Sequence, residues 1–215
     1  MSSENRLKIT EIFGSIQGES DLVGWPTVFV RLTGCPLRCT WCDTPYSFHG
    51  GQWMAFEEIV SRIRDFGFSR VCVTGGEPLS QKRCIELLRV LCDEGLTVSL
   101  ETSGAIDISE VDARVIKVVD FKAPGSGEEA RNLWTNLEHL NAADQIKLVI
   151  ADQADFDWAA RQIEERSLDR WQVLLSPVWD QLHPRDLAEW ILESGLPVRL
   201  QVQLHKYLWG NTPGH

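Results

Sequence analysis

The chain has 215 residues, of which 43% are apolar, so it can bury a full core, and we expect one domain over residues 1–215. A net charge of −10 gives no long-range attraction for nucleic acid, and no basic stripe with interleaved aromatic residues is present. No apolar run approaches the roughly 18 residues of a membrane span, and no apolar signal segment opens the sequence, so we expect a cytoplasmic protein with a small-molecule substrate and no membrane partner.

A pattern of helix, glycine and strand recurs along the chain. Glycine just past a helix can adopt the left-handed conformation that turns the chain toward the next strand. The predicted helices cover residues 56–63, 84–91 and 187–191, followed by Gly67, Gly95 and Gly195 and by strands over 71–73, 97–100 and 198–200. Further strands are predicted over 27–32, 115–121, 145–150 and 171–175, and further helices near 128–140 and 153–167.

This alternation predicts an α/β fold. Strands that are buried on both faces and separated by helices form parallel sheets with right-handed crossovers. About seven such strands favour an incomplete parallel (βα) barrel over a doubly wound open sheet. In either architecture, ligands gather at the C-terminal ends of the strands.

Four polar or glycine-containing segments follow four of these strands. They are the cysteine-containing loop after 27–32, residues 74–78 after 71–73, residues 101–104 after 97–100, and residues 120–122 at the end of 115–121. Chance would scatter such segments over both ends of a sheet. Their common placement predicts one site.

Cys35, Cys39 and Cys42 lie within eight residues. A structural zinc site needs four ligands, and no fourth Cys or His is suitably placed in the sequence, which disfavours a partial zinc site or a redox pair. Three thiolates can instead hold three irons of a four-iron, four-sulfur cluster and leave the fourth iron open. The three other cysteines, Cys72, Cys84 and Cys92, are expected to be buried apolar residues without disulfides.

The cysteine spacing resembles the signature of the radical S-adenosylmethionine superfamily, and the segment 75–78 (GGEP) resembles its glycine-glycine-glutamate motif. The resemblance implies a [4Fe-4S] cluster and S-adenosylmethionine as cofactors. It also implies that the cofactor contacts the strand ends, where a pair of glycines lets backbone approach a ligand closely. The expected cofactor-binding residues are Gly76, Glu77, Glu101, Ser103, Asp120, Phe121 and Lys122.

Three further segments resemble the 7-carboxy-7-deazaguanine synthase family: residues 13–19 (FGSIQGE), 42–44 (CDT) and 203–207 (QLHKY). The resemblance covers essentially the whole chain. It implies a lyase that removes hydrogen from C6 of 6-carboxy-5,6,7,8-tetrahydropterin, contracts the ring and releases ammonia. The product, 7-carboxy-7-deazaguanine, feeds queuosine and other 7-deazapurine pathways. The family also implies Mg²⁺, a homodimer, and an electron donor such as flavodoxin or ferredoxin.

Carried over by position, Thr44 matches the magnesium ligand of the family, and a hydroxyl is a hard oxygen donor that suits this ion. A glutamine amide can pair with the pterin edge, and an arginine can form a two-pronged bond with its carboxylate. The substrate-binding residues implied in this way are Ile16, Gln17, Gly18, Arg31, Thr74 and His205.

Two other readings stay open at this point. A glycyl-radical activase shares the three-cysteine loop but needs an open face for a protein substrate, whereas residues 15–19 and 203–207 are expected to close a small pocket. An electron-transfer or structural iron–sulfur protein is the other alternative, but such a protein would not need the four segments that converge at the strand ends. The tail over 209–215 departs from those family members that end sooner, and it either lines the site or leads away from it.

Overall fold

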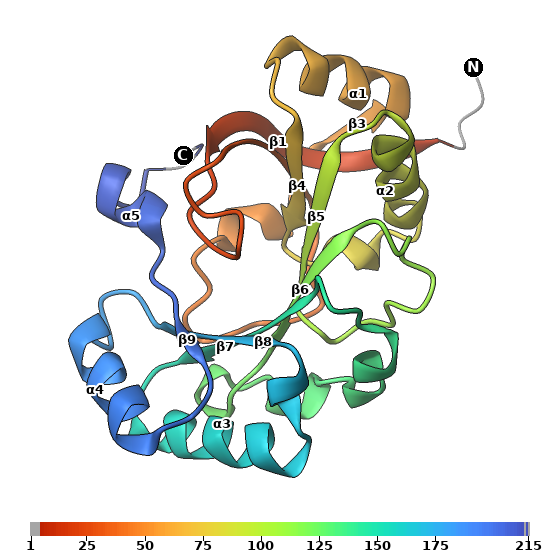
Figure 1. Ribbon diagram of the computed structural model, residues 1–215. Coiled ribbons are helices and arrows are strands. Elements are labelled where there is room, and N and C mark those ends of the chain that lie inside the picture. The colour runs from red at the N-terminus through yellow and green to blue at the C-terminus, as the bar shows by residue number, and fades with distance from the viewer. Residues whose placement is uncertain (1–4, 213, 215) are drawn as a thin grey trace.

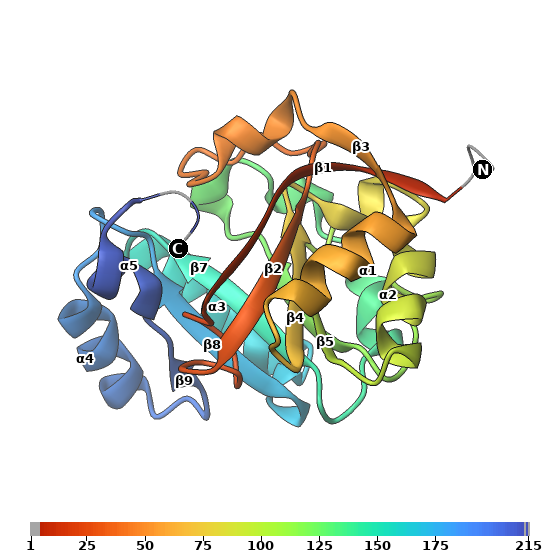
Figure 2. The same ribbon diagram turned by 90° about the horizontal axis from the view of Figure 1, so that it is seen from above.

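The structure, a computed structural model, describes residues 5–212 and 214 (Figure 1). One nine-stranded sheet curves around a central space in the order β3-β1-β2-β4-β5-β6-β7-β8-β9. In the described residues, the end strands β3 and β9 each pair with one neighbour but not with each other. The barrel is therefore incomplete, as the sequence predicts. Viewed from above, α1 and α2 lie outside one part of the sheet, and α4 lies outside the opposite part (Figure 2).

All seven predicted strands are present, and they pair in parallel. Two more strands, β1 and β3, were not predicted, and β1 runs antiparallel to both β2 and β3. A register shift between Ile9 and Glu11 breaks the two-residue alternation by which β1 would be recognised. The strands are β1 (Arg6–Ile16), β2 (Pro26–Leu32), β3 (Gln52–Ala55), β4 (Arg70–Gly75), β5 (Thr97–Thr102), β6 (Ile116–Phe121), β7 (Gln145–Ile150), β8 (Gln172–Pro177) and β9 (Arg199–Leu200).

Five α-helices accompany the sheet, and four of them follow the predicted spacing. Gly67 and Gly95 follow the first two at φ values of +70° and +78°, which confirms the predicted left-handed turns. The fifth helix, near the C-terminus, was not predicted. The helices are α1 (Phe56–Asp65), α2 (Cys84–Asp93), α3 (Gln153–Glu165), α4 (Pro184–Ser194) and α5 (Leu204–Trp209).

The helix predicted near 128–140 is wrong. The segment instead forms two 3₁₀ helices, Glu129–Arg131 and Trp134–His139. Its core-facing residues, Trp134, Leu137 and Leu140, recur every three residues, which matches the three residues per turn of a 3₁₀ helix rather than the α-helical repeat.

Alternation along the strands divides the molecule into two layers. One face of each strand packs its apolar side chains against the helices and forms the core. The other face points polar side chains into the barrel: Arg31 of β2 is the register partner of Thr74 of β4, and Asp120 of β6 is that of Lys147 of β7. This polar interior positions the site.

In the part of the chain that the structure describes, no helix has both the length and the apolar character needed to cross a bilayer.

Candidate active site

A cavity of about 740 Å³ opens at the C-terminal ends of the strands, within the usual size range of small-molecule sites. It is lined by the cysteine loop, by the ends of β4 to β8 and by the C-terminal segment. All the sequence-predicted site residues line this cavity except Gly18, Glu77 and Phe121. The tail also lines it, through Gly210, Asn211, Thr212 and Gly214, whereas Pro213 and His215 lie outside the described residues.

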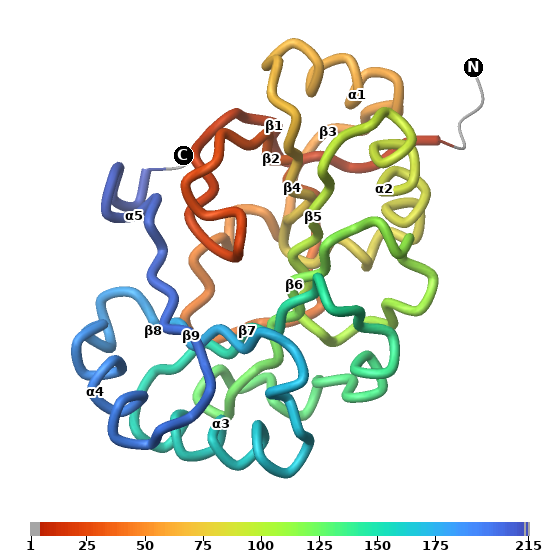
Figure 3. Tube along the Cα trace, viewed as in Figure 1, coloured from red at the N-terminus to blue at the C-terminus, as the bar shows by residue number. Residues whose placement is uncertain are grey.

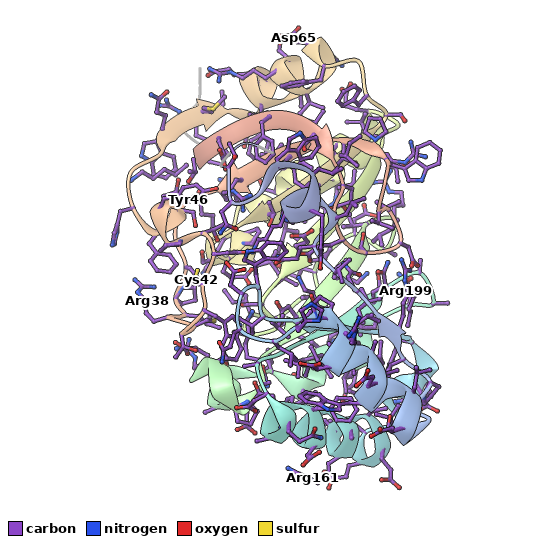
Figure 4. All side chains as sticks on the ribbon, turned by 90° about the vertical axis from the view of Figure 1, so that its left-hand side faces the viewer. Arg38, Cys42, Tyr46, Asp65, Arg161 and Arg199 are labelled. Carbon is purple, nitrogen blue, oxygen red and sulfur yellow. The ribbon has the colours of Figure 1, made fainter. Side chains whose placement is uncertain are left out.

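The cysteine loop follows β2 and is fixed by backbone contacts at both ends. Gly34, at φ +101°, donates its N–H to the Ser47 carbonyl at 2.8 Å. Thr40 donates its N–H to the Ser126 carbonyl at 3.1 Å and its hydroxyl to the Gly125 carbonyl at 2.8 Å. Figure 4 shows Arg38, Cys42 and Tyr46, all from this region, along one edge of the molecule. These hydrogen bonds fix the position of the loop on the cavity wall.

The three thiols of the cysteine loop suit an iron–sulfur cluster. Cys35, Cys39 and Cys42 are free, partly exposed, and line the same cavity. Within residues 5–212 and 214, no three His, Cys, Asp or Glu side chains converge closely enough to hold one metal ion, as zinc with its Zn–S distances of about 2.3 Å requires. Three thiolates on one cavity wall are the soft donors that iron–sulfur clusters use. Burial raises the pKa of Cys35 and Cys39, so ligation must displace their protons.

Gly76 lets the end of β4 pack directly on the cysteine loop. A Cβ at this position would lie 2.5 Å from the Gly34 carbonyl oxygen and 2.6 Å from Cys35 Cβ. The next residue, Glu77, donates its N–H to the same Gly34 carbonyl at 2.9 Å. The glycine pair therefore leaves backbone, rather than side chain, beside the cysteines, where a ligand can approach closely.

The Glu77 side chain turns away from the cavity and is fully buried. Its carboxylate accepts hydrogen bonds from the Leu79 N–H at 2.9 Å, from the Thr102 hydroxyl at 2.9 and 3.0 Å, and from the Ser103 N–H at 2.6 Å and hydroxyl at 2.5 Å. Glu77 thereby fixes the end of β5, including Ser103, which does line the cavity. Phe121 is likewise turned away and stacks on Trp134 at a centroid distance of 4.4 Å.

Two carboxylates that line the cavity can accept further hydrogen bonds from a ligand. Glu101 accepts a bond from the Thr74 hydroxyl at 3.1 Å, and burial, with a contribution from the Glu19 charge, raises its pKa. Asp120 pairs with Lys122 at 3.0 Å, while its Oδ1 is buried without a protein partner. A buried acceptor of this kind calls for a ligand that donates a hydrogen bond. Burial is the largest effect and opposes the charge of Lys122, but the charge and hydrogen bond of Asp120 together with the Cys39 charge raise the pKa of the lysine.

Arg31 is held so that part of its guanidinium stays available. Its Nε donates to Glu11 Oε1 at 2.7 Å, and the Tyr46 hydroxyl donates to the same oxygen at 2.8 Å. Because Arg31 lines the cavity, its terminal nitrogens can bond a ligand there. Gln17 also has an unpaired donor. Its Oε1 accepts a hydrogen bond from the Glu19 N–H at 3.2 Å, while its buried Nε2 has no hydrogen-bond partner among the described residues.

Sequence reasoning missed a buried ion pair between Glu19 and Lys147, both of which line the cavity. Burial is the largest effect and opposes ionisation of each group. The partner charge and hydrogen bond together outweigh it, helped by Gln203 for Glu19 and by the Asp120 and Glu101 charges for Lys147, so the pKa of Glu19 is lowered and that of Lys147 is raised. The signal in the sequence is the position of Lys147 between Ile146 and Leu148. In a strand, this alternation places the lysine on the face opposite the core.

His205 lies beside Gly18, where a Cβ would collide with its ring and backbone N–H. Burial lowers the pKa of His205 from its ordinary 6.5, while the Glu19 charge acts in the opposite direction. The ring is therefore neutral at pH 7 and can both donate and accept a hydrogen bond.

We expect an NMR titration of His205 to show a midpoint below 6.5. Because the folded-state pKa is lowered, the folded protein binds this proton less tightly than the unfolded chain, so this group's contribution to stability falls as pH drops through the region below 6.5. In the Glu19→Gln variant the midpoint is expected to fall further, since the opposing negative charge is gone. A wild-type midpoint above 6.5, or an upward shift in the variant, would contradict this assignment.

Comparisons with known proteins agree with this geometry. Residues 29–119 match the family model of the Radical SAM superfamily. The chain is 46% identical over 213 residues to 7-carboxy-7-deazaguanine synthase of Chlorobaculum tepidum, covering 97% of each chain. It is 41% identical to the synthase of Koribacter versatilis, covering 94% of this chain and 97% of that protein.

Among solved structures, QueE from Escherichia coli matches with a TM-score of 0.77 and 25% identity, covering 95% of this chain and all of that one. Streptococcus suis SuiB bound to S-adenosylmethionine shares the fold, with a TM-score of 0.51 and 14% identity over 79% of this chain and 45% of that one. The three-cysteine loop, the incomplete barrel and these full-length matches lead to one conclusion: the chain belongs to the 7-carboxy-7-deazaguanine synthase family of the radical S-adenosylmethionine superfamily.

Proposed function

We propose that the cavity converts 6-carboxy-5,6,7,8-tetrahydropterin to 7-carboxy-7-deazaguanine with loss of ammonia, as a carbon–nitrogen lyase. The observation that carries this proposal is that two sets of residues, here called half-sites, line one cavity. The cysteine loop and the ends of β4 to β6 form the first half-site. Arg31, Gln17 and His205 form the second.

In the first half-site, Cys35, Cys39 and Cys42 would hold the [4Fe-4S] cluster, and the neighbouring strand ends would bind S-adenosylmethionine. The backbone at Gly76, the Ser103 hydroxyl and the open Asp120 Oδ1 provide polar contacts for it. When bound, the cluster and S-adenosylmethionine supply the hydrogen-abstracting chemistry. The protein's contribution is to position the reacting carbon and exclude water.

In the second half-site, Arg31 binds the substrate carboxylate through its terminal nitrogens. Gln17 Nε2 donates to the ring, and the neutral His205 and the Thr74 hydroxyl complete the polar contacts. Glu101, from the strand end between the two half-sites, accepts a hydrogen bond from the ligand. We further propose Thr44 as a Mg²⁺ ligand, since the hydroxyl lies on the same cavity wall as the cluster cysteines.

Closure of the cavity favours a small substrate over a protein substrate. The β1–β2 loop and the C-terminal segment meet, because the Leu204 N–H donates to the Gly18 carbonyl at 3.0 Å. A glycyl-radical activase needs this side open. We also propose that residues 1–215 act as one domain, that two copies form a homodimer, and that a small one-electron carrier such as flavodoxin or ferredoxin reduces the cluster.

The proposal is tested by anaerobic incubation of the reconstituted protein with the tetrahydropterin, S-adenosylmethionine and a reductant, with and without Mg²⁺. A product lighter by one ammonia is expected, formed faster with Mg²⁺. S-Adenosylmethionine cleavage without this product, together with a radical on an added glycyl-radical protein, would favour the activase instead.

Replacing Thr44 by valine removes the hydroxyl but keeps the shape of the side chain. We expect the KM for Mg²⁺ to rise at least about tenfold, equivalent to about 1.4 kcal/mol, with the EPR signal of the reduced cluster unchanged. Steady-state rates at varied Mg²⁺ concentration measure the effect. An unaltered Mg²⁺ dependence would exclude Thr44 as a ligand.

A further inference from the structure

The cysteine loop is held at two places by two different parts of the chain. Its first half is tied to the segment after β6: Thr40 bonds the Gly125 and Ser126 carbonyls, and the Arg38 N–H donates to Glu128 at 2.5 Å. Its far corner is Asp43, which follows Cys42 directly. This corner is tied to the C-terminal segment, 160 residues away.

Gln203 bridges the corner of the loop to the barrel interior. Its Nε2 donates to Asp43 Oδ2 at 3.3 Å and to Glu19 Oε1 at 2.8 Å. Glu19 in turn pairs with Lys147 of β7. One side-chain amide thus connects the cysteine loop, the β1–β2 loop and a central strand.

Lys206 holds the same carboxylate from inside the protein. Its side chain is only 8% exposed, and its Nζ lies 3.2 Å from Asp43 Oδ2 and 5.6 Å from the centre of the Trp179 ring. Burying an ammonium group costs free energy that one ion pair repays only when its geometry is good. A buried ion pair of this kind adds little to the stability of the fold. Its more direct effect is to fix the position of the Asp43 carboxylate.

The segment that carries both residues is itself anchored. The Leu204 N–H bonds the Gly18 carbonyl, and the absence of a side chain at Gly18 leaves the space that His205 fills. In Figures 1 and 3, α5 lies beside the β1–β2 loop, across the open side of the barrel and apart from the helices that cover the outer face. Because the segment is fixed to the barrel, it can hold Asp43 in a fixed position relative to the barrel.

We propose that Gln203 and Lys206 are positioning residues that clamp Asp43 and thereby fix the two groups on either side of it, the Cys42 thiolate and the Thr44 hydroxyl. The role of those two groups rests on the proposed function. Loss of the clamp leaves the core intact, because the apolar core that the described residues form includes no residue after Leu200. The loop corner then samples several positions, and the Mg²⁺ site and the third cluster ligand lose their fixed geometry.

The test uses Lys206→Met and Gln203→Ala in the reconstituted protein, with Leu208→Ala as the matched control on the exposed face of the same helix. We expect amide hydrogen exchange of a peptide covering residues 39–44 to accelerate at least about tenfold in both variants. The control should show no such acceleration, and the exchange of β4 and β5 should be unchanged in all variants. We also expect the KM for Mg²⁺ to rise, and Lys206→Arg to restore much of the protection, since it keeps the ion pair.

A double-mutant cycle makes the assignment specific. In an Asp43→Asn background the Lys206→Met substitution is expected to add little further exchange, because its partner charge is already gone. Unchanged exchange of residues 39–44 in both single variants would overturn the clamp, as would an equal effect in Leu208→Ala. Exchange is measurable whether or not the protein turns over the pterin, so failure of the proposed reaction would be seen separately, in the wild-type assay.

Discussion

Replacing Cys39 by alanine is expected to lower turnover at least about a thousandfold, or about 4 kcal/mol in activation free energy, while the protein remains folded. The thiol lies on the cavity wall and takes no part in the apolar core. Its loss removes one of the three proposed cluster ligands without creating a cavity among packed side chains. Turnover in the anaerobic pterin assay and thermal unfolding followed by circular dichroism measure the two effects.

Cys84→Ala is the matched control, because Cys84 is fully buried in the first turn of α2. Here the expected pattern is reversed: stability falls by about 1 kcal/mol through the lost apolar contact, and turnover per folded molecule is retained. A Cys39→Ala protein that keeps its activity after reconstitution with iron and sulfide would refute the assignment of the cluster ligands.

Replacing Arg31 by methionine is expected to lower kcat/KM for the tetrahydropterin at least about a hundredfold, or about 2.7 kcal/mol. The side chain is largely buried, at 14% exposure, and the substitution removes its pairing with Glu11 as well as the proposed pairing with the substrate carboxylate. Arg31→Lys is expected to recover little, because an ammonium group cannot bond Glu11 and a carboxylate in the same fork geometry. The affinity for S-adenosylmethionine should change little.

A substrate analogue without the 6-carboxylate isolates the interaction. The wild-type protein is expected to bind this analogue far more weakly than the substrate, whereas Arg31→Met should bind the two about equally. If the variant discriminated between them as strongly as the wild-type protein does, another group would have to bind the carboxylate.

Features that are local in sequence were predictable. The three-cysteine spacing, the buried strands and the glycines after α1 and α2 each follow from a few neighbouring residues. The incomplete barrel followed from counting parallel strands. Strand β1 is hard to detect because its register shift at residues 9–11 breaks the alternation. The helix predicted near 128–140 is wrong because the residues that pack on the core there recur every three positions, which suits the 3₁₀ helices that form.

Contacts between distant segments were not predictable from local patterns. Glu19 and Lys147 are 128 residues apart, and Asp43 and Lys206 are 163 apart, so only the folded, incomplete barrel brings each pair together. The direction of a side chain is similarly set by tertiary packing. Glu77 belongs to a recognisable motif, yet its carboxylate bonds Thr102 and Ser103 rather than facing the cavity.

The most direct test is electron–nuclear double resonance on the anaerobically reduced protein, with S-adenosylmethionine labelled with ¹⁵N at its amino group and ¹⁷O at its carboxylate. Three protein ligands leave one iron for the small molecule, so both labels should show hyperfine coupling to the cluster. No coupling from either label, with a fourth protein side chain bound at that iron, would contradict the account.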